Sequence, residues 1–334
     1  MGEGQMLYRS LGRSGLKLSA LSLGSWVTFA TQIDETAAMD MMACAFEQGV
    51  TFFDNAESYA LGESERLMGR ALQRLGWPRD RFCVSSKVFF GSVPHPAPTQ
   101  RGLSRKHLVE ACNQSLSRLQ LDYLDLFFCH RPDPETPIEE IVTTMQLLIT
   151  QGKILYWGTS EWPASLIETA LRVARERQAE PPVMEQPQYN LLVRKRVEEE
   201  YRALCQSYGL GLTTWSPLAS GVLTGKYASG EASSAEGGRL RLPGYEWLGA
   251  RLDSESGARE LEASRKLLVL AHDRDAKPSQ LAIAWCLSNP HVSSVILGAS
   301  RKSQLLENLS ALEWVQHMTP ELKAEIEALC PNPL

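Results

Sequence analysis

The sequence has no long apolar run, no C-x-x-C pair and no excess of basic residues, and each absence excludes a class of protein. No apolar stretch reaches the roughly 18 residues that a membrane-spanning helix needs, so we expect no membrane insertion. The 334 residues carry 34 basic and 39 acidic side chains, a formal net charge of −5, which argues against a nucleic-acid partner. An apolar fraction of 43% supports a sizeable core instead.

Cysteine is scarce and scattered. The seven cysteines are odd in number and widely separated, which favours reduced, buried thiols over a disulfide framework or a zinc site. We therefore expect no metal and a cytoplasmic location. The first residues, MGEGQMLYRSLG, lack the basic-then-apolar order of a secretory signal, which also favours a cytoplasmic location.

The chain does contain a repeated alternation of short apolar strands and amphipathic helices. Several strands are apolar throughout, as expected for parallel strands covered on both faces. The predicted strands are Leu18–Leu23, Gly49–Asp54, Phe82–Lys87, Tyr123–Cys129, Leu155–Thr159, Val183–Gln186, Gly211–Trp215 and Ser294–Leu297. The predicted helices are Glu35–Gln48, Glu63–Leu75, Arg105–Leu119, Ile138–Gln151, Ala164–Gln178, Lys195–Tyr208, Arg259–Asp273, Ser279–Ser288 and Ser303–Leu312.

Eight strands, seven of them followed closely by a helix, predict an α/β fold: a (β/α)8 TIM barrel forming a single domain over residues 1–334, with extra C-terminal helices. A doubly wound open sheet is less economical, because LGSW after the first strand is not a G-x-G-x-x-G turn. Ser220–Gly257 is rich in Gly, Ala and Ser, and we expect it to form a long mobile loop after the seventh strand. Such loops are often active-site lids.

Four ionisable side chains lie at the ends of the second, third and fourth strands, where a barrel enzyme has its active site. They are Asp54, Tyr59, Lys87 and His130. Taken singly, each has an ordinary explanation, such as a turn, an ion pair or packing. Consecutive strand ends of a barrel lie within side-chain reach of one another, so their convergence favours one shared site.

The chemistry that fits these four residues is proton donation by a tyrosine. A phenol has a pKa of about 10 and is a poor acid at neutral pH, but a cation about 4 Å away raises its acidity roughly a thousandfold. We therefore expect Lys87 to acidify Tyr59, with Asp54 keeping the ammonium charged. We expect His130 to orient a substrate carbonyl. This arrangement indicates carbonyl reduction with hydride from a nicotinamide cofactor.

Seven motifs stand in order along the chain: FFDNAESY, SSKVFFG, YLDLFFCHRPD, YWGTSEW, EQPQYN, WSPLASGVLTGKY and VILGASRKSQLLENL. Together they resemble the aldo-keto reductase superfamily of NADPH-dependent (β/α)8 oxidoreductases, from about Leu7 to Ala328. GSWVTF, RGLSRKHLVEA, RPDPETP and QLAIAWCLSNPHVSSVILGAS resemble in particular the branch of the voltage-gated potassium channel β-subunits and their bacterial relatives.

The resemblance implies NADPH-dependent reduction of aldehydes, and less readily of ketones, with Tyr59 as the general acid of the tetrad. His130 begins the segment HRPDP, where animal members of the channel branch have a segment that resembles NRPDP. The histidine is the ordinary residue of the enzymes in the superfamily, which favours catalysis over a purely sensory role. The implied cofactor contacts are Ser25, Trp26, Gln32, Asp54, His130, Ser160, Gln186, Trp215, Ser216, Pro217, Leu218, Ala219, Ser220, Lys226, Arg239, Gly298, Ser300, Arg301, Gln304, Glu307 and Asn308. The implied substrate pocket, lined by Trp26, Phe29, Tyr59, Phe89, Phe90 and Trp162, favours apolar or aromatic carbonyl compounds.

Within the cofactor set, the resemblance places Trp215 under the nicotinamide ring and Ser216–Ser220 along the pyrophosphate. The helix that is expected to begin near Ser303, together with Arg301 and Lys302, suits a 2′-phosphate, which favours NADPH over NADH.

Two features depart from the family pattern. Glu161 stands where many relatives carry Asn or Arg, and its role is open. Residues 229–242 do not align cleanly with the branch, so Arg239 is assigned as a pyrophosphate clamp with Arg241 as the alternative. The branch alone implies a second class of function, an NADP(H)-binding regulatory subunit of a potassium channel or another partner, and it also implies a homo-tetramer.

Overall fold

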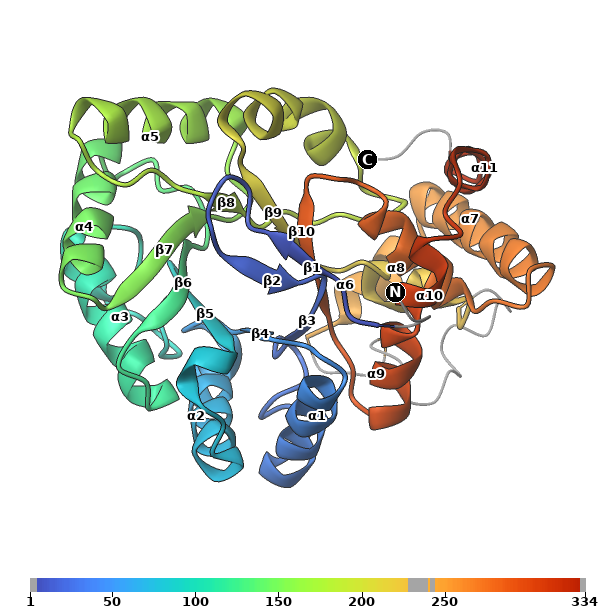
Figure 1. Cartoon of the computed structure of the whole chain (residues 1–334), viewed down its shortest axis with the longest axis horizontal. Helices are drawn as coiled ribbons and strands as arrows, with labels where there is room; N and C mark the ends of the chain where they lie inside the picture. The colour runs from blue at the N-terminus through green and yellow to red at the C-terminus, as the bar shows by residue number, and fades with distance from the viewer. Residues whose placement is uncertain (1–4, 228–239, 241–243, 331–334) are drawn as a thin grey trace.

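In the described part of the chain, eight parallel strands close into a barrel in the order β10-β3-β4-β5-β6-β7-β8-β9 (Figure 1). The computed structural model describes all residues except 1–4, 228–239, 241–243 and 331–334. The strands are β3 (Leu21–Gly24), β4 (Phe52–Asp54), β5 (Cys83–Val88), β6 (Leu124–Cys129), β7 (Ile154–Thr159), β8 (Met184–Glu185), β9 (Gly211–Thr214) and β10 (Val292–Leu297). The predicted (β/α)8 barrel is confirmed.

Helices surround the barrel and cover the outer face of its strands (Figure 1). They are α1 (Glu35–Glu47), α2 (Glu63–Leu75), α3 (Arg105–Leu119), α4 (Ile138–Thr150), α5 (Ala164–Glu176), α6 (Glu246–Leu252), α7 (Glu255–His272), α8 (Pro278–Leu287), α9 (Lys302–Leu309), α10 (Ala311–Val315) and α11 (Pro320–Ala328). Capping side chains mark where α1 and α3 begin. The Asp34 and Ser104 side chains accept hydrogen bonds from the first-turn N–H groups of Ala37 and His107.

Several predictions about elements need correction. The predicted strand Leu18–Leu23 is interrupted at Ala20, so that β2 (Lys17–Ser19) and β3 belong to different sheets. The segment predicted as a helix at Lys195–Tyr208 is helical, but it contains two π-helical segments, Arg196–Glu200 and Leu204–Tyr208. Ser220–Gly257 is not a structureless loop in its described part, since it contains α6 and the start of α7. Helix α11 was not predicted at all.

A hairpin of β1 (Tyr8–Ser10) and β2 closes one end of the barrel. The backbone N–H of Arg13 donates to the carbonyl of Gly209, just before β9 begins. Gly12 makes this approach feasible, because its φ is +54° and a Cβ there would lie 2.2 Å from the Gly209 oxygen. Leu11 and Leu18 of the hairpin join barrel residues such as Phe52 in a buried apolar cluster.

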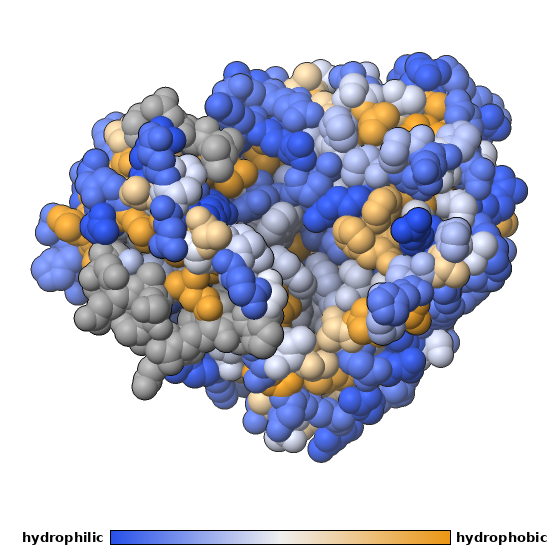
Figure 2. Space-filling view, turned by 180° about the vertical axis from the view of Figure 1, so that it is seen from behind, coloured by the Kyte–Doolittle hydropathy of each residue, from blue (hydrophilic) through white to orange (hydrophobic). Residues whose placement is uncertain are grey.

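The opposite end of the barrel, where the strands reach their carboxyl termini, is therefore the open one. Figure 2 views the molecule from the side opposite to Figure 1 and shows a hollow near the middle of that face. The seven cysteines are all free, and only Cys330 is partly exposed. Within the ranges described, the helices are too short or too polar to cross a membrane.

Candidate active site

The four predicted ionisable residues lie together at the open end of the barrel. Asp54 ends β4, Lys87 lies in β5, His130 follows β6, and Tyr59 begins the turn after β4. The Lys87 Nζ donates to Asp54 Oδ2 at 2.6 Å and lies 3.0 Å from the Tyr59 hydroxyl. The rings of Tyr59 and His130 meet edge to face with centroids 5.9 Å apart.

The buried ion pair between Lys87 and Asp54 is hydrogen-bonded on every side. Lys87 is fully buried, and its ammonium also donates to the Asn55 carbonyl at 2.8 Å. The second Asp54 oxygen accepts from Ser85 Oγ at 2.7 Å and from Gln186 Nε2 at 3.1 Å. A buried pair is stable only when its remaining donors and acceptors are satisfied in this way.

The electrostatics of Tyr59 differ from the prediction. Burial, and after it the Asp54 carboxylate, raise the pKa of the Tyr59 phenol well above its ordinary value. The expected acidification by Lys87 is therefore not the net effect of this environment. Burial also lowers the pKa of Lys87 itself, against the opposing pull of Asp54. Tyr59 consequently holds its proton throughout the neutral range.

His130 is a neutral imidazole in this site. Burial, with the positive charges of Lys87 and Arg131, holds its pKa well below the ordinary value of 6.5. Its Nδ1 is buried and meets no hydrogen-bond partner within the described part of the chain. A buried ring nitrogen without a partner is unusual in a protein interior.

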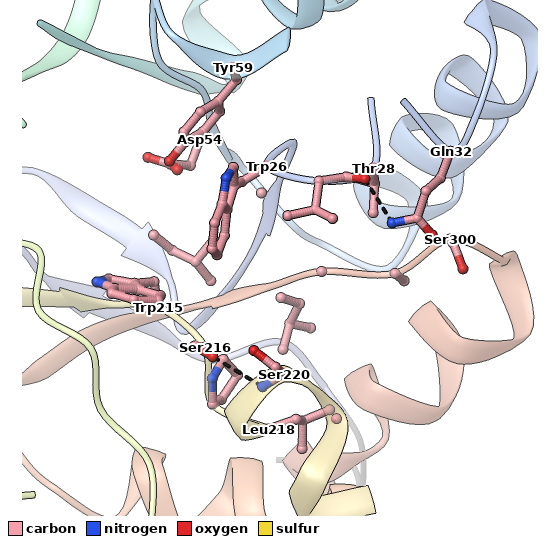
Figure 3. Close-up of a pocket in the computed structure, with 18 of the residues that line it drawn as sticks. Trp26, Thr28, Gln32, Asp54, Tyr59, Trp215, Ser216, Leu218, Ser220 and Ser300 are labelled. Atoms are coloured by element: carbon pink, nitrogen blue, oxygen red, sulfur yellow. Dashed lines mark hydrogen bonds between the residues drawn. The ribbon is translucent and has the colours of Figure 1, made fainter. Parts of the chain in front are cut away.

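A cavity of about 970 Å³ runs from these residues toward β10 and α9. Figure 3 shows Trp26 between Tyr59 and Trp215, with Ser216, Leu218 and Ser220 following on the turn after β9. The Trp26 ring centroid is 6.4 Å from that of Tyr59 and 5.8 Å from that of Trp215. Ser300 and Gln32 line the far end of the same view.

Most of the predicted cofactor residues line this one cavity. They are Trp26, Gln32, Asp54, His130, Ser160, Gln186, Trp215, Ser216, Pro217, Leu218, Ser220, Lys226, Gly298, Ser300, Arg301, Gln304, Glu307 and Asn308. Ser25 and Ala219 do not line it: Ser25 is fully buried and donates to the Asp54 carbonyl, and Ala219 packs into the core. Arg239 and Arg241 lie outside the described residues.

Three residues of the predicted substrate pocket do not line the cavity. Phe29 and Trp162 are buried, 1% and 0% exposed, in the core behind the barrel rim, and neither reaches the cavity. Phe89 packs against the core, and its N–H donates to Glu57 Oε1. Trp26 and Phe90 do line the cavity. Aromatic character alone could not separate rim residues from core residues.

The cavity also contains residues that the sequence analysis did not assign. Arg131, Tyr245 and Thr28 are among them. Arg131 adjoins His130 at the end of β6, so its place at a strand end was a usable signal. Tyr245 comes from the segment after β9, where no sequence pattern indicates which aromatic ring turns inward.

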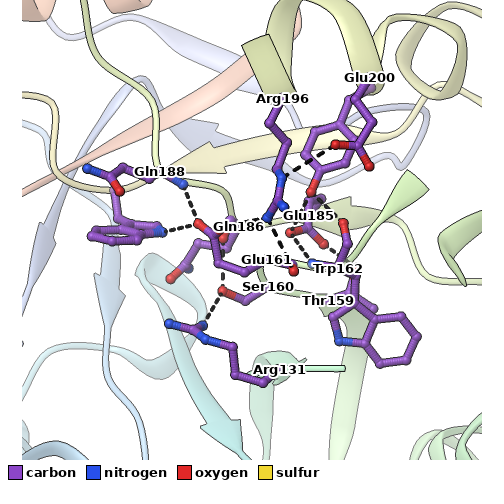
Figure 4. Close-up of polar contacts among 12 residues, drawn as sticks. Arg131, Thr159, Ser160, Glu161, Trp162, Glu185, Gln186, Gln188, Arg196 and Glu200 are labelled. Atoms are coloured by element: carbon purple, nitrogen blue, oxygen red, sulfur yellow. Dashed lines mark hydrogen bonds and ion pairs between the residues drawn. The ribbon is translucent and has the colours of Figure 1, made fainter. Parts of the chain in front are cut away.

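Glu161, whose role the sequence left open, connects three of the loops around the site. Its φ is +59°, a left-handed conformation that costs energy in a residue with a Cβ. One carboxylate oxygen accepts from the Gln188 N–H at 2.6 Å and from the Trp215 indole N–H at 3.0 Å. The other pairs with Arg196 at 2.7 Å. Figure 4 shows Glu161 between Gln188 and Arg196. These bonds fix the orientation of the Trp215 ring.

The donors in the cavity match a dinucleotide with phosphate groups. Lys226 and Arg301 supply positive charge, and Arg301 precedes α9, whose first N–H groups have no side-chain cap. Trp215 offers an aromatic face at the other end, and the Ser160 and Gln186 side chains are amide-recognising groups beside it. This donor set fits a nicotinamide cofactor and a carbonyl substrate.

Comparison with known proteins agrees with this geometry and with the resemblance read from the motifs. The sequence model of the aldo/keto reductase family matches residues 20–329. A probable voltage-gated potassium channel subunit beta of Oryza sativa subsp. japonica is 48% identical over 324 residues, 97% of this chain and 96% of that protein. A protein of the same description from Arabidopsis thaliana is 47% identical over 322 residues, 96% of each. The chain belongs to the aldo/keto reductase family.

Proposed function

We propose that the chain is an NADPH-dependent reductase that converts aldehydes, and less readily ketones, to alcohols. The observation that carries the proposal is the chain of contacts from Asp54 through Lys87 to the Tyr59 hydroxyl at the wall of the cavity. These contacts support the proposal because a phenol beside a buried cation could protonate a carbonyl oxygen as that oxygen gains negative charge.

Tyr59 gives its proton to the oxygen of the substrate. A raised pKa suits this role in the direction of reduction, because the phenol is protonated at neutral pH and the alkoxide that forms is a far stronger base. As the proton leaves, Lys87 stabilises the phenolate oxygen 3.0 Å away. Asp54 holds the ammonium in place and keeps it charged.

His130 orients the same oxygen. A neutral imidazole carries one N–H donor, and the low pKa of His130 keeps it neutral at working pH. It therefore polarises a carbonyl without competing with Tyr59 for the transfer of a proton.

NADPH, when bound, supplies the hydride that adds to the carbonyl carbon. Trp215 would hold the nicotinamide face, and Ser160 and Gln186 its carboxamide. The pyrophosphate would lie along Ser216, Pro217, Leu218, Ser220 and Lys226. Arg301 at the start of α9 would receive the 2′-phosphate, which is the reason to prefer NADPH to NADH.

A second candidate function is that of a regulatory subunit that binds NADP(H) and attaches to a channel or another partner with little turnover. The printed descriptions of the rice and Arabidopsis relatives favour it. The complete tetrad favours catalysis. A homo-tetramer and a cytoplasmic location remain part of the proposal for either function.

Turnover separates the two functions. The purified chain is mixed with NADPH and 4-nitrobenzaldehyde, and loss of NADPH absorbance is followed over single and multiple turnovers with the alcohol product identified by chromatography. Repeated turnover supports the reductase. A bound cofactor that excess aldehyde never oxidises would support the regulatory subunit.

A further inference from the structure

We propose that Arg131 makes the substrate end of the cavity a site for carbonyl compounds that carry a carboxylate group. The inference rests on the proposed function and names the substrate class of that site. Its evidence is the position of one guanidinium, the charge balance around it and the aromatic wall beside it.

Arg131 lies next to the reacting groups. It directly follows His130 at the end of β6, and its half-buried side chain lines the cavity together with Tyr59 and Phe90. Its positive charge is near enough to lower the pKa of both Lys87 and His130. A single small molecule could therefore bind Arg131 through a negatively charged group while its carbonyl lies at Tyr59.

The contacts of Arg131 are with neutral groups. Its Nη1 donates to the His130 carbonyl at 2.5 Å and lies 3.5 Å from Ser160 Oγ, a contact drawn in Figure 4. Its guanidinium carbon is 5.7 Å from the Phe90 ring centroid. Over the residues that the structure describes, no carboxylate forms an ion pair with it, whereas the partly buried Arg79 and the buried Arg118 each meet one, Asp125 and Glu65.

The charges around Arg131 leave this end of the cavity positive. Asp54 is neutralised by Lys87 at 2.6 Å, and both Tyr59 and His130 are uncharged at neutral pH. Within the described lining, the other acidic side chain is Glu307, which lies on α9 and accepts from Ser279. A half-buried guanidinium with spare donors is suited to a carboxylate, which it binds through two parallel hydrogen bonds.

The body of the substrate is set by the rings beside Arg131. Trp26, Tyr59 and Phe90 line the same end of the cavity, and Phe90 contacts both His130 and the guanidinium. A flat ring or a short apolar chain would pack against these faces. The class that matches both features is an aldehyde whose apolar body ends in a carboxylate.

The experiment compares isosteric aldehydes that differ only in charge. Steady-state kcat/KM is measured with NADPH for 3- and 4-carboxybenzaldehyde and for the neutral 3- and 4-carbamoylbenzaldehyde, in the wild type, in Arg131→Met and in Arg101→Met. Arg101 is exposed and does not line the cavity, so its variant has the same loss of charge without the loss of the proposed contact. The quantity compared is the carboxy-to-carbamoyl ratio, which cancels any general effect of a variant on catalysis.

We expect the ratio for the better-fitting isomer to fall by about tenfold or more in Arg131→Met, since a charge-assisted bidentate contact is lost. Arg101→Met should leave the ratio within about twofold. A ratio that does not change in Arg131→Met for either isomer would overturn the inference while leaving the reductase intact. If the wild type turns over none of the aldehydes, the proposed function fails. In that case, calorimetry with NADPH present measures the dissociation constants of the carboxy and carbamoyl aldehydes. A preference for the carboxy compound that is lost in Arg131→Met would support the inference, and an unchanged preference would overturn it.

Discussion

The Nζ of Lys87 lies 3.0 Å from the hydroxyl of Tyr59. This contact depends on how two neighbouring strands of the barrel are paired. Lys87 belongs to β5, which pairs in parallel with β4, and Tyr59 follows the end of β4. The buried Asp54 completes the arrangement from β4 itself. The position of Lys87 relative to Tyr59, the proton donor of the proposed enzyme, is thus set by the register of two neighbouring strands.

Replacing Lys87 tests its electrostatic role. Lys87→Met should lower kcat for aldehyde reduction by about 10²-fold or more, because the phenolate loses its stabilising cation. It should also destabilise the fold by about 3–5 kcal/mol, because Asp54 is left buried and unpaired. Kinetics and chemical denaturation measure the two effects.

The double variant Asp54→Asn with Lys87→Met separates them. It removes both charges, so much of the stability should return while the activity stays low. Recovery of activity together with stability would show that Lys87 acts only through folding.

The pH dependence of reduction should be flat over the neutral range. Tyr59 is active when protonated, and burial raises its pKa well above the ordinary value of about 10, so that it stays protonated throughout this range. His130 becomes charged only well below pH 6.5. We therefore expect kcat/KM for 4-nitrobenzaldehyde to be constant from about pH 6.5 to about pH 9 and to fall only on the alkaline side. A fall with its midpoint near pH 7 or 8 would show that another group controls proton delivery.

Glu161 should control cofactor binding through Trp215. Glu161→Ala removes the acceptor of the indole N–H and leaves Arg196 without that carboxylate, so the dissociation constant of NADPH should rise about tenfold. Glu161→Gln keeps an acceptor for Trp215 and should bind NADPH more tightly than Glu161→Ala. Quenching of tryptophan fluorescence by NADPH measures both. Equal affinities in the wild type and Glu161→Ala would remove the positioning role.

Glu185 makes the stability of the fold depend on pH. Burial raises the pKa of its carboxyl from the usual 4.5 to about 8, beneath the loop that carries Glu161. The folded state therefore binds a proton that the unfolded state releases above pH 4.5. Its stabilising contribution is lost as the pH rises from 4.5 to about 8 and is level above that.

Glu185→Gln has no such proton to lose. The free energy of unfolding of Glu185→Gln minus that of the wild type should therefore rise by about 1 kcal/mol per pH unit between pH 4.5 and about pH 8. Denaturation at a series of pH values measures the difference. Glu199→Gln, at an exposed glutamate nearby, is the control and should show no trend. A flat difference for Glu185→Gln would mean that the buried carboxyl is ionised in the native state.

The barrel and the tetrad were predictable from sequence because they rest on local patterns. β6 is largely apolar and buried throughout, and the polar His130 that directly follows it lies at the rim. β5 is also buried throughout, but it carries Lys87 within the strand, one residue before its end. Helices α2 and α3 were predicted with their observed bounds, and Gly62, Gly76 and Ser104 mark three of their four ends. Parallel strand order then brings the polar ends together.

The parts that were not predictable depend on tertiary packing. Phe29 and Trp162 follow strand ends just as Trp26 does, yet they turn into the core, and aromatic composition does not reveal the direction. The net pKa of Tyr59 depends on how far burial outweighs a neighbouring cation, which requires the whole environment. The role of Glu161 required knowing that Gln188, Arg196 and Trp215 converge on it.

Removing one oxygen atom from Tyr59 tests proton donation by this residue directly. Tyr59→Phe keeps the ring against Trp26 and His130 and loses only the hydroxyl that contacts Lys87. With saturating NADPH and 4-nitrobenzaldehyde, we expect kcat to fall by about 10²–10⁴-fold while the dissociation constant of NADPH stays within about twofold of the wild type. A variant that still oxidises NADPH within about threefold of the wild-type rate would contradict proton donation by Tyr59.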